Sequence, residues 1–217
     1  AFQATRKKAA QEELAGALKI FNTVVPDAED QAQPEGELPY TSKESRDEQA
    51  LRRFRQIADQ QGWSVVGELA RFYVGITQRR LKHYQESLES FRDIVDQSSR
   101  PEMRNLARNH VALLALHLGQ RPQAIEAWNQ ILDDPSSHIP ASEIMSNLAK
   151  TYDAAGQKAE ALDLFKRLND EHPSLPNTAS IEARIALLES EIGSGKDSGP
   201  TSEDAEADPE NPGENGG

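Results

Sequence analysis

The sequence repeats a short amphipathic pattern at a fixed interval of 37 residues. Four eleven-residue windows align without gaps: QALRRFRQIAD, ESLESFRDIVD, QAIEAWNQILD and EALDLFKRLND, which begin at Gln49, Glu86, Gln123 and Glu160. Self-similarity at a fixed period of this length is the signature of stacked repeat units. This feature therefore constrains the fold before any other.

Each window predicts an α-helix with one buried face. A small residue, an aromatic residue and an aliphatic residue follow one another at offsets of 4 and then 3, the spacing that lines one side of a helix. The small residue allows a neighbouring helix to approach closely, and the aromatic ring fills the space one turn further on. The three columns are Ala50, Ser87, Ala124 and Ala161, then Phe54, Phe91, Trp128 and Phe165, then Ile57, Ile94, Ile131 and Leu168.

A second series of helices alternates with these windows and keeps the same interval. Its phase is given by a column of small residues, each preceded by an aliphatic residue: Gly75, Ala112, Ala149 and Ala186. In two of the repeats, the turns GQRP (119–122) and GQKA (156–159) separate the two helices of the pair. Glycine there suits the position after a helix end, and Pro122 suits the first turn of the next helix.

A helix–turn–helix unit cannot bury its own apolar face, so such units stack on one another. One unit resembles the tetratricopeptide repeat in its small, aromatic and proline positions: Leu148, Ala149, Tyr152, Gly156, Ala161, Phe165 and Pro173. The usual repeat has about 34 residues, and the three extra residues here lengthen helix ends or the loops between repeats. The resemblance implies an all-α fold, a right-handed superhelical solenoid of antiparallel helix pairs with a C-terminal capping helix.

The ends of the chain depart from the repeat. A solenoid is expected over residues 1–192, with an N-terminal helix at about 5–25, a proline-containing loop at 26–43, repeats from about 44 and a capping helix at 178–192. The N-terminal helix would serve as the displaced partner of the first window, burying Leu14, Leu18, Phe21 and Val25. Residues 193–217 carry seven acidic residues and one lysine and no apolar residue larger than alanine or proline. They predict a disordered acidic tail.

Composition argues against several classes of function. The net charge of −12 disfavours nucleic-acid and anionic membrane surfaces. The absence of cysteine excludes disulfides and thiol chemistry. His110 and His117 lie two helical turns apart, whereas a metal pair on one helix is spaced nearer i, i+4. No phosphate-binding glycine loop or nucleophile elbow is present. We therefore predict a protein that is not an enzyme and that uses no cofactor or metal.

The function expected of such a solenoid is protein binding on the concave wall that the first helix of each pair builds. Counted from the small-residue column, one repeat contributes Phe72, Ile76 and Arg79, the next Asn109, Leu113 and Leu116, and the last Ser146, Lys150 and Asp153. A partly apolar wall suits an extended or helical segment of another protein. Alternatively, Phe72, Ile76 and Leu113 pack on the N-terminal helix or within the stack. The cations are too scattered to favour capture of a partner's terminal carboxylate.

The order of an N-terminal helix, a proline-containing loop and repeats of 37 residues resembles the bacterial membrane-anchored tetratricopeptide proteins of the YfgM-like type, which are ancillary to the Sec translocon. The resemblance covers about residues 5–192. It implies a periplasmic location behind a transmembrane helix that precedes the N-terminal helix, with Arg6, Lys7 and Lys8 near the membrane surface. The alternative location is the cytoplasm.

Two functions remain open from the sequence. The first is a non-enzymatic scaffold or chaperone-like adaptor that holds client segments, including secretory or envelope proteins. The second is a structural subunit whose repeats mediate a fixed homo- or hetero-oligomeric assembly. The oligomeric state in solution separates them.

Overall fold

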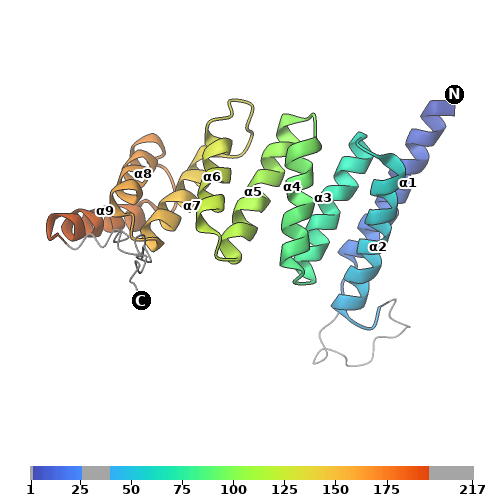
Figure 1. Ribbon diagram of the computed structural model, residues 1–217, viewed down its shortest axis with the longest axis horizontal. Coiled ribbons are helices and arrows are strands. Elements are labelled where there is room, and N and C mark those ends of the chain that lie inside the picture. Colours follow the sequence, from blue (N-terminus) through green and yellow to red (C-terminus); the bar gives the residue numbers. More distant parts are fainter. Residues whose placement is uncertain (1, 26–39, 196–217) are drawn as a thin grey trace, which may run out of the picture. The chain divides into compact units, whose positions relative to one another are not determined.

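The computed structural model describes residues 2–25 and 40–195. Within these residues the fold contains only α-helices and connecting turns (Figure 1). The helices are α1 (Phe2–Asn22), α2 (Lys43–Gln61), α3 (Val65–Arg80), α4 (Tyr84–Gln97), α5 (Pro101–His117), α6 (Arg121–Leu132), α7 (Ala141–Ala154), α8 (Lys158–Glu171) and α9 (Thr178–Gly193). The chain forms two compact units, Ala1–Pro140 and Ala141–Gly217. The predicted acidic tail lies outside the described residues from residue 196 onward, as does most of the predicted loop at 26–43.

The four repeated windows lie in α2, α4, α6 and α8, and the structure confirms the buried face predicted for each. The small residue of every window is completely buried. The aromatic and aliphatic columns are buried as well, with at most 5 % of any side chain exposed: Phe54, Phe91, Trp128, Phe165, Ile57, Ile94, Ile131 and Leu168. The columns of the sequence are therefore the core of the helix pairs.

The turns between helices follow from local sequence. Gly119 and Gly156 both adopt a φ of 77° just after α5 and α7, the left-handed conformation in which glycine has no steric penalty. The equivalent position after α3 is Lys82, which adopts a φ of 63°. Ser42 and Ser45 form a capping box at the start of α2, and Pro101 and Pro122 lie in the first turns of α5 and α6.

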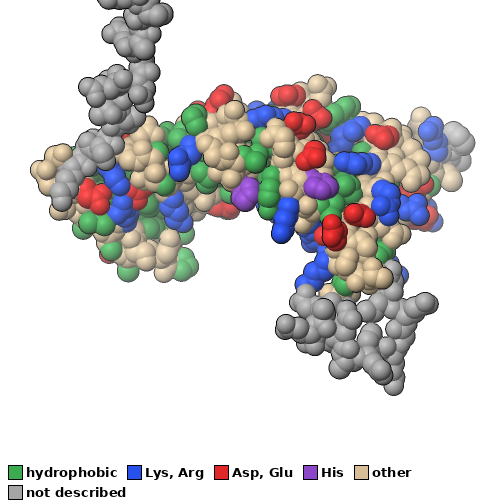
Figure 2. All heavy atoms as spheres, turned by 60° about the horizontal axis from the view of Figure 1, so that its bottom comes forward, with side chains coloured by type: hydrophobic (Ala, Val, Ile, Leu, Met, Phe, Trp, Pro, Cys, Tyr) green, Lys and Arg blue, Asp and Glu red, His purple; other side chains and the backbone are tan. Residues whose placement is uncertain are grey.

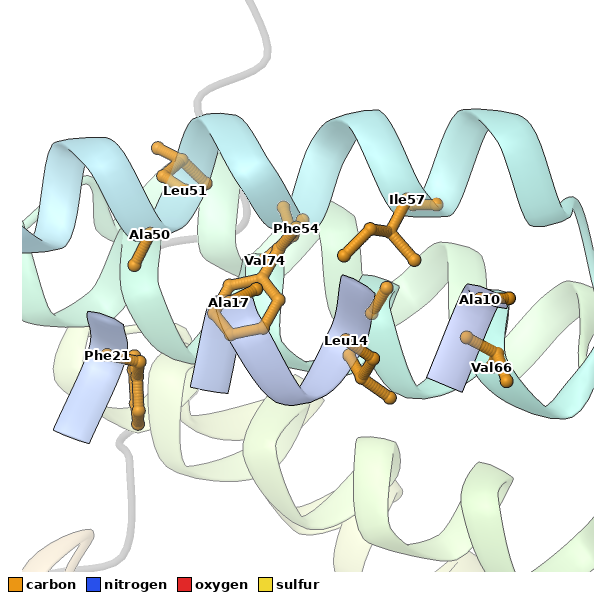
Figure 3. Close-up of a cluster of buried hydrophobic side chains, with 12 residues drawn as sticks. Ala10, Leu14, Ala17, Phe21, Ala50, Leu51, Phe54, Ile57, Val66 and Val74 are labelled. Carbon is orange, nitrogen blue, oxygen red and sulfur yellow. The ribbon is translucent and has the colours of Figure 1, made fainter. Parts of the chain in front are cut away.

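Helix α1 packs against α2 and α3 and completes the first apolar cluster (Figure 3). Leu14 and Phe21 of α1 belong to this cluster together with Phe54 and Ile57 of α2 and Val74 of α3. The stripe predicted for this helix is confirmed, since Leu14, Phe21 and Val25 are buried and Leu18 packs against the cluster. The helix begins and ends about three residues earlier than the range of 5–25 expected from sequence.

Two arginines hold the C-terminal end of α1 in place. Arg46 Nη1 donates to the carbonyl of Thr23 at 2.9 Å, and Arg80 Nη1 donates to the carbonyl of Phe21 at 3.0 Å. The Arg80 guanidinium also lies 3.6 Å from the centre of the Phe21 ring. Asp47, which is buried, pairs with both arginines. Cations at the last carbonyls of a helix satisfy unpaired acceptors and complement the helix dipole.

Candidate protein-binding surface

The candidate surface in the first unit, called here the α3–α5 face, is formed by successive turns of two helices. Helix α3 contributes Phe72, Ile76 and Arg79, and α5 contributes Leu106, Asn109, Leu113 and Leu116. The spacings of 3 and 4 residues place each set on one side of its helix. The two helices come together at this face, where the Phe72 ring of α3 lies 5.2 Å from the His110 ring of α5.

The α3 side of this face is largely packed. The Phe72 ring makes edge-on contacts with Phe91 at 5.3 Å and Tyr73 at 6.3 Å, so it belongs partly to the aromatic core. Ile76 is half-buried against the cluster that α1 completes. Arg79 is exposed. The packed state of Phe72 and Ile76 matches the alternative drawn from sequence, and their role in binding stays a prediction.

The α5 side is more open. Asn109 Oδ1 accepts a hydrogen bond of 3.0 Å from Trp128 Nε1, which fixes the asparagine side chain beside a fully buried ring. Leu113 is half-buried. Leu116 is 36 % exposed, and Leu106 is 45 % exposed. Sequence reasoning missed Leu106, although it lies one turn before Asn109 and 37 residues after Leu69, so the repeat interval would have found it.

The α7 residues predicted for the wall lie in the second unit. Ser146 is half-buried, and Lys150 is exposed. Asp153 is engaged inside its own unit, since it accepts hydrogen bonds from Lys158 Nζ at 2.8 Å and Arg184 Nε at 2.6 Å. These cations and hydrogen bonds lower the pKa of Asp153 against the effect of its burial. Asp153 therefore joins α7, α8 and α9 and has little capacity left for a partner.

His110 lies beneath the α3–α5 face as a neutral ring. Its ring stacks on Phe91 at 4.5 Å with an interplanar angle of 12°, and its Nδ1 is buried without a hydrogen-bond partner among the described residues. Burial, and secondarily the charge of Arg79, lowers the pKa of His110 to about 4. At neutral pH the positive charge of this face therefore comes from Arg79 and not from His110.

His110 should make stability depend on pH. Because its folded-state pKa lies below the ordinary value of 6.5, the unfolded chain binds the proton first as the pH falls. The resulting stability is present above pH 6.5 and is lost progressively down to about pH 4. Lowering the pH from about 7 to about 5 should cost about 2 kcal/mol through this residue. Chemical denaturation of the native protein and of His110→Phe should show the loss only in the former. Equal losses in both would contradict the assignment.

Hydrophobic side chains on the face seen in Figure 2 lie among charged ones. In the described part of the chain, no three or more histidine, cysteine, aspartate or glutamate side chains are grouped as a metal site would need. None of the described helices is long and apolar enough to cross a membrane. On the α3–α5 face, the side chains available to a partner are the exposed leucines, the exposed Arg79 and the amide of Asn109.

Comparison with known proteins identifies the fold. Residues 143–174, which contain most of α7 and all of α8, match the tetratricopeptide repeat family. This is a tetratricopeptide-repeat fold. Two crystal structures are similar to it, both of a Podosopora anserina protein described as a kinesin light chain with nearly identical tetratricopeptide-like repeats, one of them carrying a single substitution. Each has a TM-score of 0.56 at 15 % identity.

Both matches cover 86 % of this chain, and they cover 88 % and 87 % of the two solved chains. At this identity the likeness concerns the fold alone. A comparison with curated proteins finds no match. The tetratricopeptide-repeat assignment thus agrees with the residue columns that were predicted from sequence, and repeats of this kind generally mediate protein–protein interactions.

Proposed function

We propose that this protein is a non-enzymatic adaptor of chaperone-like character that binds apolar segments of client proteins on the α3–α5 face. One observation carries the proposal: Leu106 and Leu116 are 45 % and 36 % exposed on α5, with Leu113 half-buried between them. Ten residues separate the two exposed leucines, which corresponds to about 15 Å along a helix. That length accommodates two to three turns of a helical client or a short extended strand.

The chemistry of this face favours apolar clients with a polar or acidic flank. Leu106, Leu113 and Leu116 offer aliphatic contacts, Asn109 offers a rigid amide, and Arg79 offers an exposed cation beside them. A pre-organised face of this kind loses little conformational freedom when a client binds. Ionic contacts at Arg79 would add selectivity more than affinity.

The test uses a permanently unfolded client, reduced and carboxymethylated α-lactalbumin, and the variant Leu106→Asp with Leu116→Asp. Burying two carboxylates against an apolar segment is unfavourable, so we expect the dissociation constant to rise at least about tenfold. Fluorescence anisotropy with the labelled client measures the effect. Val24→Asp, which alters a side chain that is 82 % exposed outside the α3–α5 face, is the matched control.

Circular dichroism first establishes that each variant has native helicity. Unchanged affinity in a folded Leu106→Asp, Leu116→Asp protein would remove the proposed function. Native protein that forms one fixed oligomer at all concentrations, with no affinity for the client, would instead support a structural subunit. Light scattering after size-exclusion chromatography separates these two results.

A finer proposal rests only on the resemblance to the YfgM-like proteins. It is that the protein works in the bacterial periplasm, next to a transmembrane helix encoded before Ala1, and that its clients are secretory or envelope proteins. The basic residues Lys7 and Lys8 at the start of α1 are exposed and suit a position beside anionic lipid headgroups. Recovery of the full-length protein in the soluble cytoplasmic fraction of its source cells would contradict this location.

A further inference from the structure

A cavity of about 100 Å³ lies between α2, α3 and α4 in the first unit. We call it the Trp63 pocket and define it by six of its lining residues: Arg55 and Asp59 of α2, Trp63 in the turn after α2, Arg71 and Val74 of α3, and Asp93 of α4. Val74 is buried and Arg71 is half-buried, so these two form the floor. The other four residues are exposed and form the rim.

The Arg71 guanidinium is a cation held in a fixed position on the floor. Its Nη2 donates a hydrogen bond of 3.0 Å to the carbonyl of Ala58, and its Cζ lies 4.7 Å from the centre of the Trp63 ring. Arginine favours such stacking on an aromatic ring. Nevertheless, no carboxylate of the described residues forms an ion pair with Arg71, and its Nε is buried without a hydrogen-bond partner among them.

The next repeat shows how the equivalent arginine is neutralised within the protein. Arg108 follows Arg71 by 37 residues, and its Nη1 lies 3.8 Å from the carboxylate of Asp134. The residue 37 positions before Asp134 is Gln97, which carries no charge. Arg71 therefore lacks the carboxylate that its repeat equivalent has.

The rim of the pocket exposes apolar surface that a partner can cover. Trp63 is 40 % exposed, and Val65, at the start of α3, is 62 % exposed. The residue equivalent to Trp63 in the next repeat is Arg100, which pairs with the buried Glu68 and offers no aromatic ring. Tryptophan and arginine are enriched among the residues that dominate binding at protein interfaces. A small ligand inside the pocket would leave Val65 uncovered, so this surface suits a segment of a protein.

We propose that the Trp63 pocket binds an acidic side chain of a partner protein, flanked by apolar residues that cover the exposed rim and by basic residues. The carboxylate pairs with the Arg71 guanidinium on the floor. Arg55 on the rim adds to the attraction, whereas Asp59 and Asp93 disfavour a uniformly acidic segment and attract the flanking basic residues. The pocket thus selects a carboxylate that lies next to both aliphatic and basic side chains.

The probe is the peptide acetyl-Lys-Leu-Glu-Leu-Lys-amide, whose ends carry no charge. Isothermal titration calorimetry with the full chain measures its affinity. Tryptophan emission locates the binding, because Trp128, the other tryptophan of the chain, is completely buried. Covering the exposed Trp63 should shift the emission to shorter wavelength in proportion to the bound fraction.

We expect saturable binding that weakens at least about tenfold when glutamine replaces the glutamate of the peptide, or when Arg71→Met removes the cation. Trp63→Ala, at an exposed position, should weaken it at least about threefold. Arg121→Met, which removes an exposed arginine of α6, is the matched control and should leave affinity unchanged. Leu106→Asp with Leu116→Asp should also leave it unchanged, which separates this site from the proposed client face.

Four results would overturn the proposal. One is the absence of saturable binding at about 5 mM peptide. Another is equal affinity for the glutamate and glutamine peptides, or for the native chain and a variant at Arg71 or Trp63 that has native helicity. If Arg71→Met does not fold, Trp63→Ala alone decides. The third is free glutamate binding as tightly as the peptide, which would make the pocket a small-molecule site. The fourth is a native homodimer in light scattering that Trp63→Ala converts to a monomer, because a second copy would then occupy the pocket.

Discussion

Phe91→Ala is expected to lower the free energy of unfolding by about 3–5 kcal/mol, the range for removing a fully buried aromatic ring. Phe91 is completely buried, and its ring contacts Phe72 at 5.3 Å and stacks on His110 at 4.5 Å. The truncation leaves a cavity between α3, α4 and α5 that rigid neighbouring helices cannot close. Chemical denaturation followed by far-ultraviolet circular dichroism measures the loss.

Gly75 supplies the control, because its effect should change sign with residue 91. In the native protein a Cβ at Gly75 would meet Phe91 Cζ at 2.7 Å, so Gly75→Ala should be destabilising. In the Phe91→Ala background that obstacle is gone, and alanine in a helix is favoured over glycine by about 1 kcal/mol. Gly75→Ala should therefore stabilise the double variant. Additive effects of the two substitutions would show that this contact does not set the approach of α3 and α4.

Arg100→Ala is the second substitution with a large expected effect. The Glu68 carboxylate on α3 is paired with the Arg100 guanidinium and accepts a hydrogen bond of 3.1 Å from Ser98 Oγ. Only 2 % of the Glu68 side chain is exposed. Removing the cation leaves a buried carboxylate with one remaining partner, which should cost about 3 kcal/mol in denaturation experiments.

The pair is expected to be replaceable as a whole. Glu68→Leu combined with Arg100→Leu removes both charges and should recover most of the stability lost in Arg100→Ala. Lys166→Ala breaks an ion pair whose side chains are about half exposed, and it should cost less than about 1 kcal/mol. If Arg100→Ala were as mild as Lys166→Ala, the Glu68–Arg100 contact would be a surface interaction in energetic terms.

The repeat interval predicted the helix pairs because the same three columns of small, aromatic and aliphatic residues are buried in the core of every unit. The burial of Phe54, Phe91 and Trp128 follows from their position in one column, and the glycine turns follow from the φ that a helix end requires. The packing of α1 was also predictable, since its stripe of Leu14 and Phe21 needed an apolar partner.

Contacts that occur only once in the chain were not predictable. The Glu68–Arg100 pair, the anchoring of α1 by Arg46 and Arg80, and the use of Asp153 within its own unit join residues about 23 to 59 positions apart with no repeated spacing. The packing of the candidate binding face was not predictable for the same reason. Phe72 has the spacing of a wall residue, but the ring of His110 on the next first helix covers it.

The arginine contacts at the end of α1 have a mechanical consequence. A force applied along the axis of α1 from its N-terminal end would load the contacts of α1 with α2 and α3 in shear. At the opposite end of the helix, Arg46 and Arg80 donate hydrogen bonds to the carbonyls of Thr23 and Phe21. Under such a force these contacts are loaded at the same time and not one after another. Detaching the first helix therefore requires the loss of its apolar contacts with α2 and α3 together with both arginine contacts.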